Sequence, residues 1–493
     1  MESVAKKSLK QGLSKIFMKL KKLFKKIAGV QIKGSKDPEI SGICSNSRCV
    51  APGNLFIARK GLTENGALYI PKAIEAGAVA ILTDIYDPLL DKNIAQVISN
   101  DVNALQGIIA STYYGHPSDH LLTIGITGTN GKTTTSYIIK HLLDNINKPA
   151  GLIGTIEYIA GNHRYLATRT TPDIESNHKL LHDMIGEGCT SVVMEVTSHA
   201  LDQDRVSAID FDIAIFTNLT LDHLDYHHSF QAYFAAKKKL FLRLGASQEI
   251  TSQPETKVAI LNADSPWHED LKDTKASVMT FAINNAADIK AENISFSSNG
   301  TQFIVTYLGQ VQQFHSPLVG RFNIYNCLAA IAVGISQKVP LAALADIISI
   351  IPPIPGRLQE VPNGLNIKVY IDFAHSNDAL QNILETLQEL KTAKARLIVV
   401  FGCGGNRDLS KRPLMAKVAG QYADVSIVTS DNPRNEDPEE IIRQIVKGFD
   451  RNGKSVVHVE PDRFAAIDMA IDMAKKNDIE SPHKWRVKLL NLT

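Results

Sequence analysis

A glycine-rich loop has the residue types and spacing that bind a nucleotide triphosphate. The run is Gly128, Thr129, Asn130, Gly131, Lys132, Thr133 and Thr134. It follows an apolar segment at 121–127 that predicts a buried strand, and it precedes an amphipathic segment at 136–143 that predicts a helix. In such a loop backbone N–H groups hold the phosphates, Lys132 reaches the β- and γ-oxygens, and Thr133 offers its hydroxyl to Mg²⁺. We therefore expect ATP binding rather than a glycine turn with a solvated lysine.

Further polar residues follow two other predicted strands. Glu195 lies at the end of the apolar run 191–196, where a buried carboxylate needs a cation or donors. Mg²⁺ held jointly with Thr133 would supply that cation. The segment 217–227 follows the run 212–217 and places Asp222, His223, Asp225 and His227 in one loop. Such crowding at a strand end favours ligand or metal contact over simple capping.

Length and composition describe an ordinary globular protein. The 493 residues predict about three domains, at roughly 150 residues for each. The five cysteines are scattered, without metal-type spacing, and fit a reducing cytoplasm. No apolar run approaches the roughly 18–20 residues that cross a bilayer.

The small positive net charge comes from the N-terminus. Residues 1–26 hold nine of the 53 basic residues and one of the 51 acidic residues, so the remainder has a net charge of −6. We therefore expect no binding to nucleic acid. Within 9–27 apolar residues recur at helical spacing. This basic amphipathic segment is either a solvated, partly frayed extension or a helix that makes peripheral contact with an anionic membrane.

The positions of the predicted strands indicate an α/β protein of three domains. Strands are expected at 55–58 and 78–82, then at 121–127, 191–196 and 212–217, and finally at 395–401, 425–429 and 455–459. Turn formers near 114–118 and 337–340 mark boundaries. The predicted order is a basic extension at 1–30, an N-terminal domain at 31–116, a central phosphate-loop domain with a parallel sheet at 117–337, and a Rossmann-like domain at 338–493. Ligand loops should lie at the carboxyl ends of the strands.

An ordered series of motifs resembles the Mur ligases. Besides the loop 128–134, the series comprises the segments 194–201, 222–227, 236–241, 320–326 and 372–380. The resemblance runs from about Ile40 to Asp478, and it is strongest to the members that add the third residue of the peptidoglycan stem peptide. It implies an N-terminal domain that binds a uridine diphosphate sugar, a central ATPase domain and a C-terminal ligase domain.

The resemblance also implies the residues that handle ATP and metal. Lys237 would be carbamoylated by CO₂, and with Glu195, His223 and Thr133 it would hold Mg²⁺. The alternative for Lys237 is a solvated helix lysine, since Lys238 and Lys239 follow it. Asn323 and Asn326 would contact the adenine, while Asp372 and His375 would line the nucleotide. Lys132 would neutralise charge during phosphoryl transfer.

The implied substrates are the nucleotide-sugar dipeptide UDP-MurNAc-L-Ala-D-Glu and meso-diaminopimelate. The first would bind Thr170, Thr171, Thr197, Gln203 and Arg205, with Ser47 at the uridine diphosphate end. The diaminopimelate residues would be Arg407, Asp431, Asn432, Pro433 and Arg434. Diaminopimelate carries a distal carboxylate that lysine lacks, and Arg434 can pair with it bidentately. A surface ion pair is the alternative for each arginine.

The implied reaction is ATP-dependent amide formation through an acyl phosphate, by a monomer. The alternatives are a lysine-adding relative, a folylpolyglutamate synthase, and a remnant that binds nucleotide without efficient ligation. The non-ligating remnant is an alternative because the family continues after Asp478 with an apolar strand and a Gly-Lys-Gly-His-Glu loop. This chain instead has a polar stretch from Ile479 that is broken by Pro482. We therefore predict that this strand is lost from the third domain, and that the chain binds ATP and the nucleotide sugar but ligates weakly, with poor affinity for diaminopimelate.

Overall fold

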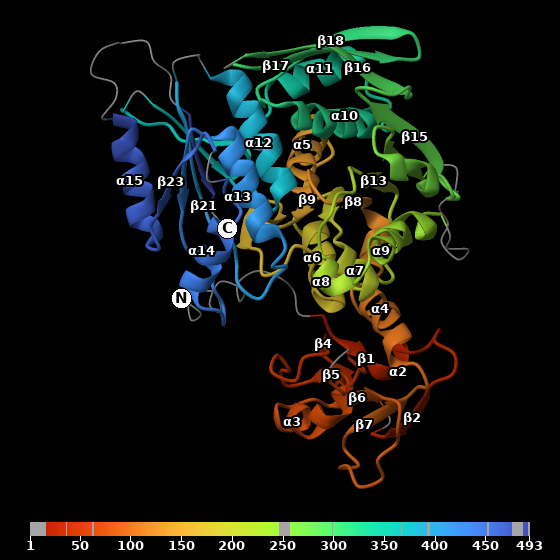
Figure 1. Ribbon diagram of the computed structural model, residues 1–493. Helices are drawn as coiled ribbons and strands as arrows, with labels where there is room; N and C mark the ends of the chain where they lie inside the picture. Colours follow the sequence, from red (N-terminus) through yellow and green to blue (C-terminus); the bar gives the residue numbers. More distant parts are fainter. Residues whose placement is uncertain are drawn as a thin grey trace. The chain divides into compact units, whose positions relative to one another are not determined.

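The protein is described from a computed structural model. It covers residues 16–35, 37–61, 64–245, 257–297, 299–365, 367–391, 395–450, 453–475 and 487–491. These residues form two compact units (Figure 1). The first takes its residues from Met1–Gly125 and Asn147–Asp212, and the second from Ile126–Ile146 and from Ile213 onward. Within the described ranges no helix is long and apolar enough to cross a membrane.

The N-terminal part of the first unit is a mostly parallel sheet with the order β2-β7-β6-β5-β4. Its strands are β2 (Gln31–Gly34), β4 (Gly42–Cys44), β5 (Asn54–Ile57), β6 (Ala80–Thr83) and β7 (Ala95–Ile98). The predicted strands at 55–58 and 78–82 are confirmed as β5 and β6. Both are buried throughout, as expected for strands covered on two faces, here by α3 (Ile70–Glu75) and α4 (Val102–Tyr113).

The solvated-extension interpretation of the N-terminus is wrong for the residues from Met18 to Phe24. Strand β1 (Met18–Lys19) pairs with β3 (Glu39–Ile40), and helix α2 (Leu20–Leu23) follows it. Leu20, Leu23 and Phe24 are buried in the core of the first unit. The helical spacing of these apolar residues therefore marks a face that packs inside the protein. Residues 1–15 lie outside the described residues.

The rest of the first unit contains strands that follow one another in the order β11-β10-β9-β12-β8 within an 11-stranded sheet. Its strands are β8 (Leu122–Thr127), β9 (Ala150–Ile153), β10 (Glu157–Ala160), β11 (His163–Leu166) and β12 (Ser191–Glu195). Strands β9 and β12 are parallel, whereas β10 and β11 form an antiparallel hairpin. Helices α6 (Ile174–Gly186) and α7 (Ser198–Asp202) flank β12 in the sequence. The predicted strands at 121–127 and 191–196 are confirmed.

The second unit begins with α5 (Lys132–Asn145) and continues with β13 (Ile213–Phe216), α8 (Leu224–His227) and α9 (Phe230–Arg243). Parallel strands follow, β14 (Val258–Asn262) and β15 (Ser277–Ala282), and then β16 (Ile289–Ser297), β17 (Gly300–Tyr307) and β18 (Gln310–Ser316). The β16–β17–β18 hairpins are antiparallel and were not predicted. Helices α10 (Arg321–Ser336) and α11 (Leu341–Ser349) complete this part.

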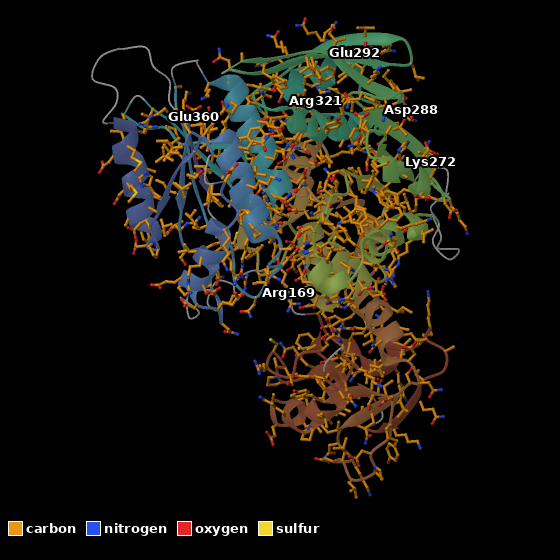
Figure 2. The ribbon with its side chains drawn as sticks, in the orientation of Figure 1. Arg169, Lys272, Asp288, Glu292, Arg321 and Glu360 are labelled. Carbon is orange, nitrogen blue, oxygen red and sulfur yellow. The ribbon has the colours of Figure 1, made fainter. Side chains whose placement is uncertain are left out.

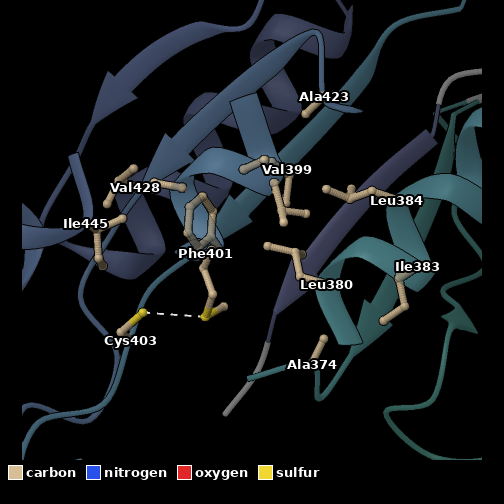
Figure 3. Close-up of a cluster of buried hydrophobic side chains, with 14 of the residues drawn as sticks. Ala374, Leu380, Ile383, Leu384, Val399, Phe401, Cys403, Ala423, Val428 and Ile445 are labelled. Atoms are coloured by element: carbon tan, nitrogen blue, oxygen red, sulfur yellow. Dashed lines mark hydrogen bonds between the residues drawn. The ribbon is translucent and has the colours of Figure 1, made fainter. Parts of the chain in front are cut away.

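The C-terminal sheet of the second unit has the order β19-β20-β24-β21-β22-β23. The strands are β19 (Gln359–Glu360), β20 (Lys368–Asp372), β21 (Leu397–Phe401), β22 (Val425–Val428), β23 (Val456–Val459) and β24 (Val487–Asn491). The helices are α12 (Asn377–Leu390), α13 (Lys411–Tyr422), α14 (Pro438–Val446) and α15 (Arg463–Lys475). In Figure 3 Val399 and Phe401 of β21 pack among Leu380, Leu384 and Ile445 of the surrounding helices.

The predicted loss of a strand from this domain is wrong. Strand β24 lies between β20 and β21 and pairs in parallel with both. The proline-broken stretch 479–486 lies outside the described residues, but the sequence directly after it, Val487 to Leu490, is rich in apolar residues. Strand β24 therefore lies at the centre of the sheet, but it begins a few residues later in the sequence than the expected strand.

We expect deletion of residues 487–493 to lower the melting temperature by about 5 °C or more, because both neighbouring strands lose their pairing partner. Thermal unfolding followed by circular dichroism measures the change. Deletion of residues 492 and 493 alone, which leaves β24 intact, is the control. Identical melting curves for the long deletion and the parent would contradict the central placement of β24.

Candidate active site

The phosphate loop is shaped by glycines that leave no space for a side chain. Gly128 has a φ of +148°, and a Cβ placed on it would lie 1.9 Å from the Thr217 hydroxyl oxygen. Gly131 has a φ of +85°, and its Cβ would lie 2.4 Å from Oδ1 of Asn326. Both positions therefore require glycine, for conformation and for close approach. The predicted helix is confirmed as α5, which begins directly after Gly131, four residues before the predicted segment 136–143.

The loop after β13 holds the phosphate loop in place. The backbone N–H of Asn130 donates to Oδ1 of Asn218 at 2.9 Å, and the hydroxyl of Thr217 donates to the Asn130 carbonyl at 2.7 Å. The hydroxyl of Thr129 donates to the Thr220 carbonyl at 3.2 Å. These contacts fix the loop backbone before any ligand arrives, so little ordering is needed on binding.

Two lysine amines converge on one carbonyl oxygen of the phosphate loop. Nζ of Lys132 donates to the Gly128 carbonyl at 2.9 Å, and Nζ of Lys237 donates to the same oxygen at 2.8 Å. Lys237 is 1% exposed and lies over the Tyr233 ring at 4.5 Å. Burial, and secondarily the charge of Lys132, lowers the pKa of Lys237 well below its usual value. The Lys237 amine is therefore biased towards its neutral, nucleophilic form.

The predicted loop 222–227 lies beside the same tyrosine. His223 adopts a left-handed backbone conformation with a φ of +56°, directly before α8. Its Nε2 lies 3.5 Å from a carboxylate oxygen of Asp222, and its ring centroid is 5.9 Å from that of Tyr233. Within this unit the structure thus brings His223 and Lys237 close to the same aromatic ring.

Asn323 and Asn326, which the resemblance assigns to adenine, are buried behind the phosphate loop. Oδ1 of Asn326 accepts a hydrogen bond from the Thr135 hydroxyl at 3.1 Å, and its amide donates to Oδ1 of Asn323 at 3.0 Å. Both side chains are 4% exposed. These contacts support α5, and contact with adenine stays a prediction.

An arginine that the sequence analysis missed reaches the proposed metal-binding threonine. Nη2 of Arg357 donates to the hydroxyl of Thr133 at 2.9 Å, and its guanidinium lies 5.1 Å from the Phe373 ring centroid. The Asp372 carboxylate accepts backbone N–H groups of Leu358 at 2.7 Å and Ala374 at 2.8 Å, and burial raises its pKa to about 6. His375 follows on the same loop, with Nδ1 3.2 Å from the Phe373 carbonyl.

Asp378 is a second residue that was missed. Its carboxylate accepts hydrogen bonds from Nδ2 of Asn130 at 2.7 Å and from the Thr220 hydroxyl at 3.2 Å. Burial raises the pKa of Asp378 above its ordinary value. Acidic residues are common in the first turn of a helix, where they stabilise the helix N-terminus. The sequence therefore does not show that this carboxylate also bonds the phosphate loop.

The predicted peptide-binding residues of the first unit lie together. The Thr171 hydroxyl contacts that of Thr197 at 3.3 Å. The Arg205 guanidinium donates to Oε1 of Gln203 at 2.6 Å and to the Thr171 carbonyl at 3.2 Å. Thr170 lies in the same loop, next to Arg169, which is labelled in Figure 2. Ser47 lies apart, in the turn that follows β4.

Glu195 ends β12 as predicted, and its carboxylate is fully buried. It accepts the backbone N–H of Thr155 at 2.8 Å and the Thr155 hydroxyl at 2.9 Å. That hydroxyl lies 3.1 Å from the hydroxyl of Thr170. The carboxylate is therefore directly linked to the loop that carries the peptide-binding threonines.

The two predicted amino-acid loops follow adjacent parallel strands, β21 and β22. Nη1 of Arg434 donates to the Gly405 carbonyl at 2.7 Å, which links the loops. Arg407 and Asn432 are exposed, whereas Asp431 and Pro433 are half-buried. In the described part of the chain no group of three or more His, Cys, Asp or Glu residues forms a metal site.

This architecture, a clamped phosphate loop in an α/β protein with polar loops at strand ends, defines a nucleotide-dependent enzyme. Three family descriptions match the chain. The Mur ligase catalytic domain matches residues 39–112, the Mur ligase middle domain matches 126–334, and the Mur ligase glutamate ligase domain matches 356–479. The chain belongs to the Mur ligase family, and it is an ATP-utilising ligase.

Individual relatives agree with this assignment. The chain is 42% identical over 471 residues to UDP-N-acetylmuramoyl-L-alanyl-D-glutamate--2,6-diaminopimelate ligase of Chlamydia caviae, which covers 94% of this chain and 93% of the relative. It is 40% identical to the protein of the same name from Geobacillus thermodenitrificans, with the same coverage. A solved structure of a ligase of that name superposes with a TM-score of 0.65 at 29% identity, covering 92% and 89% of the two chains.

We expect Asp378→Asn to raise the Michaelis constant for ATP about three- to tenfold, because charge-assisted hydrogen bonds to Asn130 and Thr220 become neutral ones. Steady-state ADP release at varied ATP measures this. Glu385→Gln is the matched control, since Glu385 lies on the same helix and accepts from Tyr422 instead. Equal ATP constants for Asp378→Asn and the parent would show that this contact does not support nucleotide binding.

Proposed function

We propose that this chain joins meso-diaminopimelate to the D-glutamate of UDP-MurNAc-L-Ala-D-Glu, at the expense of ATP, in peptidoglycan precursor synthesis. The observation that carries the proposal is Arg434, whose guanidinium is held against the neighbouring loop at the carboxyl edge of the C-terminal sheet. The names of relatives about 40% identical along nearly the whole chain support the same substrates.

In the proposed reaction the γ-carboxylate of D-glutamate attacks the γ-phosphoryl group of ATP, which gives an acyl phosphate and ADP. The neutral amine of diaminopimelate then attacks the acyl carbon, and phosphate leaves. Lys132 and the N–H groups of the loop 128–134 stabilise negative charge in the first step. Asn323, Asn326, Asp372 and His375 are assigned to the nucleotide.

Mg²⁺ is assigned to Thr133, Glu195, His223 and a carbamate on Lys237. The chemistry of Lys237 fits this assignment. A buried amine with a lowered pKa, which here donates to the Gly128 carbonyl, favours the neutral form that attacks CO₂, and the carbamate would provide anionic oxygen in place of a cation. A negative group at this position would attract Lys132 rather than repel it. The metal would supply charge stabilisation for the phosphates.

The remaining residues are assigned to the two organic substrates. Thr170, Thr171, Thr197, Gln203 and Arg205 bind the dipeptide end of the nucleotide sugar, and their contacts with one another and with the Glu195 segment support this. Ser47 is assigned to the uridine diphosphate. Arg407 and the residues from Asp431 to Arg434 are assigned to diaminopimelate.

The cellular setting completes the proposal. We place the enzyme in the cytoplasm as a monomer of three domains, with the boundaries near 116 and 337 given above. None of the five cysteines, all of which lie within the described ranges, is in a disulfide bond, which fits a reducing compartment. Peripheral membrane contact through the lysine-rich N-terminus is part of the proposal, but Leu20, Leu23 and Phe24 take no part in it, since they are buried and not available to a lipid surface.

We expect the purified chain to release ADP and form tripeptide with meso-diaminopimelate at a specificity constant at least about a hundredfold above that with lysine, because lysine lacks the distal carboxylate with which Arg434 would pair. Parallel ligation assays measure both. A preference for lysine would establish the lysine-adding alternative. ATP binding without product from either amino acid would establish the non-ligating remnant.

We expect Lys237→Ala to lose ligation by more than about a hundredfold and to regain part of it with added short carboxylic acids, because the site requires an anion at this position. Lys239→Ala, two residues further along α9, is the control. Full activity of Lys237→Ala without any additive would exclude the carbamate.

A further inference from the structure

The 404–407 loop and the 431–436 loop, which carry the two candidate substrate arginines, are joined by several hydrogen bonds. The N–H of Gly405 donates to the Asn432 carbonyl at 2.9 Å, and the N–H of Asn435 donates to Oδ1 of Asn406 at 3.0 Å. A Cβ on Gly405 would lie 1.9 Å from the Pro433 carbonyl oxygen. The two loops therefore have to move as one piece.

A buried ion pair lies beneath these loops. Arg412, on α13, is fully buried, and its guanidinium donates to both carboxylate oxygens of Glu436 at 2.9 and 3.0 Å. The same guanidinium donates to Oε1 of Gln444 on α14 at 2.7 Å and approaches the Gly404 carbonyl at 3.4 Å. One side chain thus contacts both loops and connects them to two helices.

Glu436 transmits this contact to the residues beside the substrate arginines. Its carboxylate also accepts the backbone N–H of Asn406, next to Arg407. Asn406 and Arg434 both have a φ of +50°, a conformation that residues other than glycine rarely adopt and that its surroundings must hold in place. The guanidinium of Arg434 in turn depends on the Gly405 carbonyl for its position.

We propose that Arg412 and Glu436 are positioning residues for amino-acid selection: their ion pair fixes the two loops so that Arg434 and Arg407 present their guanidinium groups to the distal carboxylate of the incoming amino acid. This inference rests on the proposed function. Arg412 is fully buried and therefore does not contact the substrate, and Glu436 acts through its bonds to Arg412 and to the Asn406 N–H. A purely structural ion pair would instead affect stability and all substrates alike.

The test is steady-state kinetics of Glu436→Gln and Arg412→Lys with each substrate varied in turn. Glutamine keeps the size and one acceptor oxygen of Glu436, whose side chain is 25% exposed. Lysine keeps the positive charge of Arg412 but lacks the planar guanidinium that donates two parallel hydrogen bonds. We expect the Michaelis constant for diaminopimelate to rise about tenfold in both variants. Those for ATP and the nucleotide sugar, and the turnover at saturating diaminopimelate, should stay within about twofold.

Two reference variants frame the result. Arg443→Gln removes an exposed arginine that pairs with Glu440 at 3.0 Å on the same helix as Gln444, and it should leave all constants unchanged. Arg434→Ala gives the size of the effect when the substrate arginine itself is lost. An unchanged diaminopimelate constant in Glu436→Gln, or an equal rise for all three substrates, would overturn the positioning role while leaving the proposed function intact. A parent chain that ligates no diaminopimelate would overturn both.

Discussion

The close approach of Gly128 to Thr217 is the constraint on which the site of the second unit depends. With no room for even a Cβ between them, the phosphate loop and the loop after β13 have one relative position. That second loop also carries Asn218, which clamps the phosphate loop, and Thr220, which is bonded to Asp378. It then continues into His223. A single glycine contact thereby sets the geometry of the phosphate-binding backbone, the candidate metal ligand and the start of α12.

The burial of Lys237 follows from the same packing. Its amine is placed on the Gly128 carbonyl beside the amine of Lys132, where two full positive charges would repel each other in a region of low dielectric constant. Burial and the charge of Lys132 lower the pKa of Lys237, and the charge of Asp222 offsets this only in part. The Lys237 amine is costly to keep charged in this buried position, and this same property suits it to react with CO₂.

The sequence alone predicted the features that depend on residues close to one another along the chain. Strands such as β5, β8 and β21 are continuous apolar runs, and the phosphate loop is marked by its own glycines. Arg357 and Asp378 were missed because they act through contacts 224 and 248 positions away along the chain. The hairpins β16 to β18 were not predicted, although more and less buried residues alternate along the middle of β17. For Leu20, Leu23 and Phe24, helical spacing could not tell a face that enters a protein core from one that meets lipid.

The place of β24 has a consequence for how this domain is made. Strands β20 and β21 are not hydrogen-bonded to each other, because residues 487–491 lie between them. During synthesis the chain therefore emerges with β20, β21, β22 and β23 complete but with the middle of their sheet open. The central ladder closes only when β24 has left the ribosome, after every other strand of the domain. Until then two adjacent rows of backbone donors and acceptors are exposed, which makes this domain the part of the nascent chain with most to gain from a chaperone.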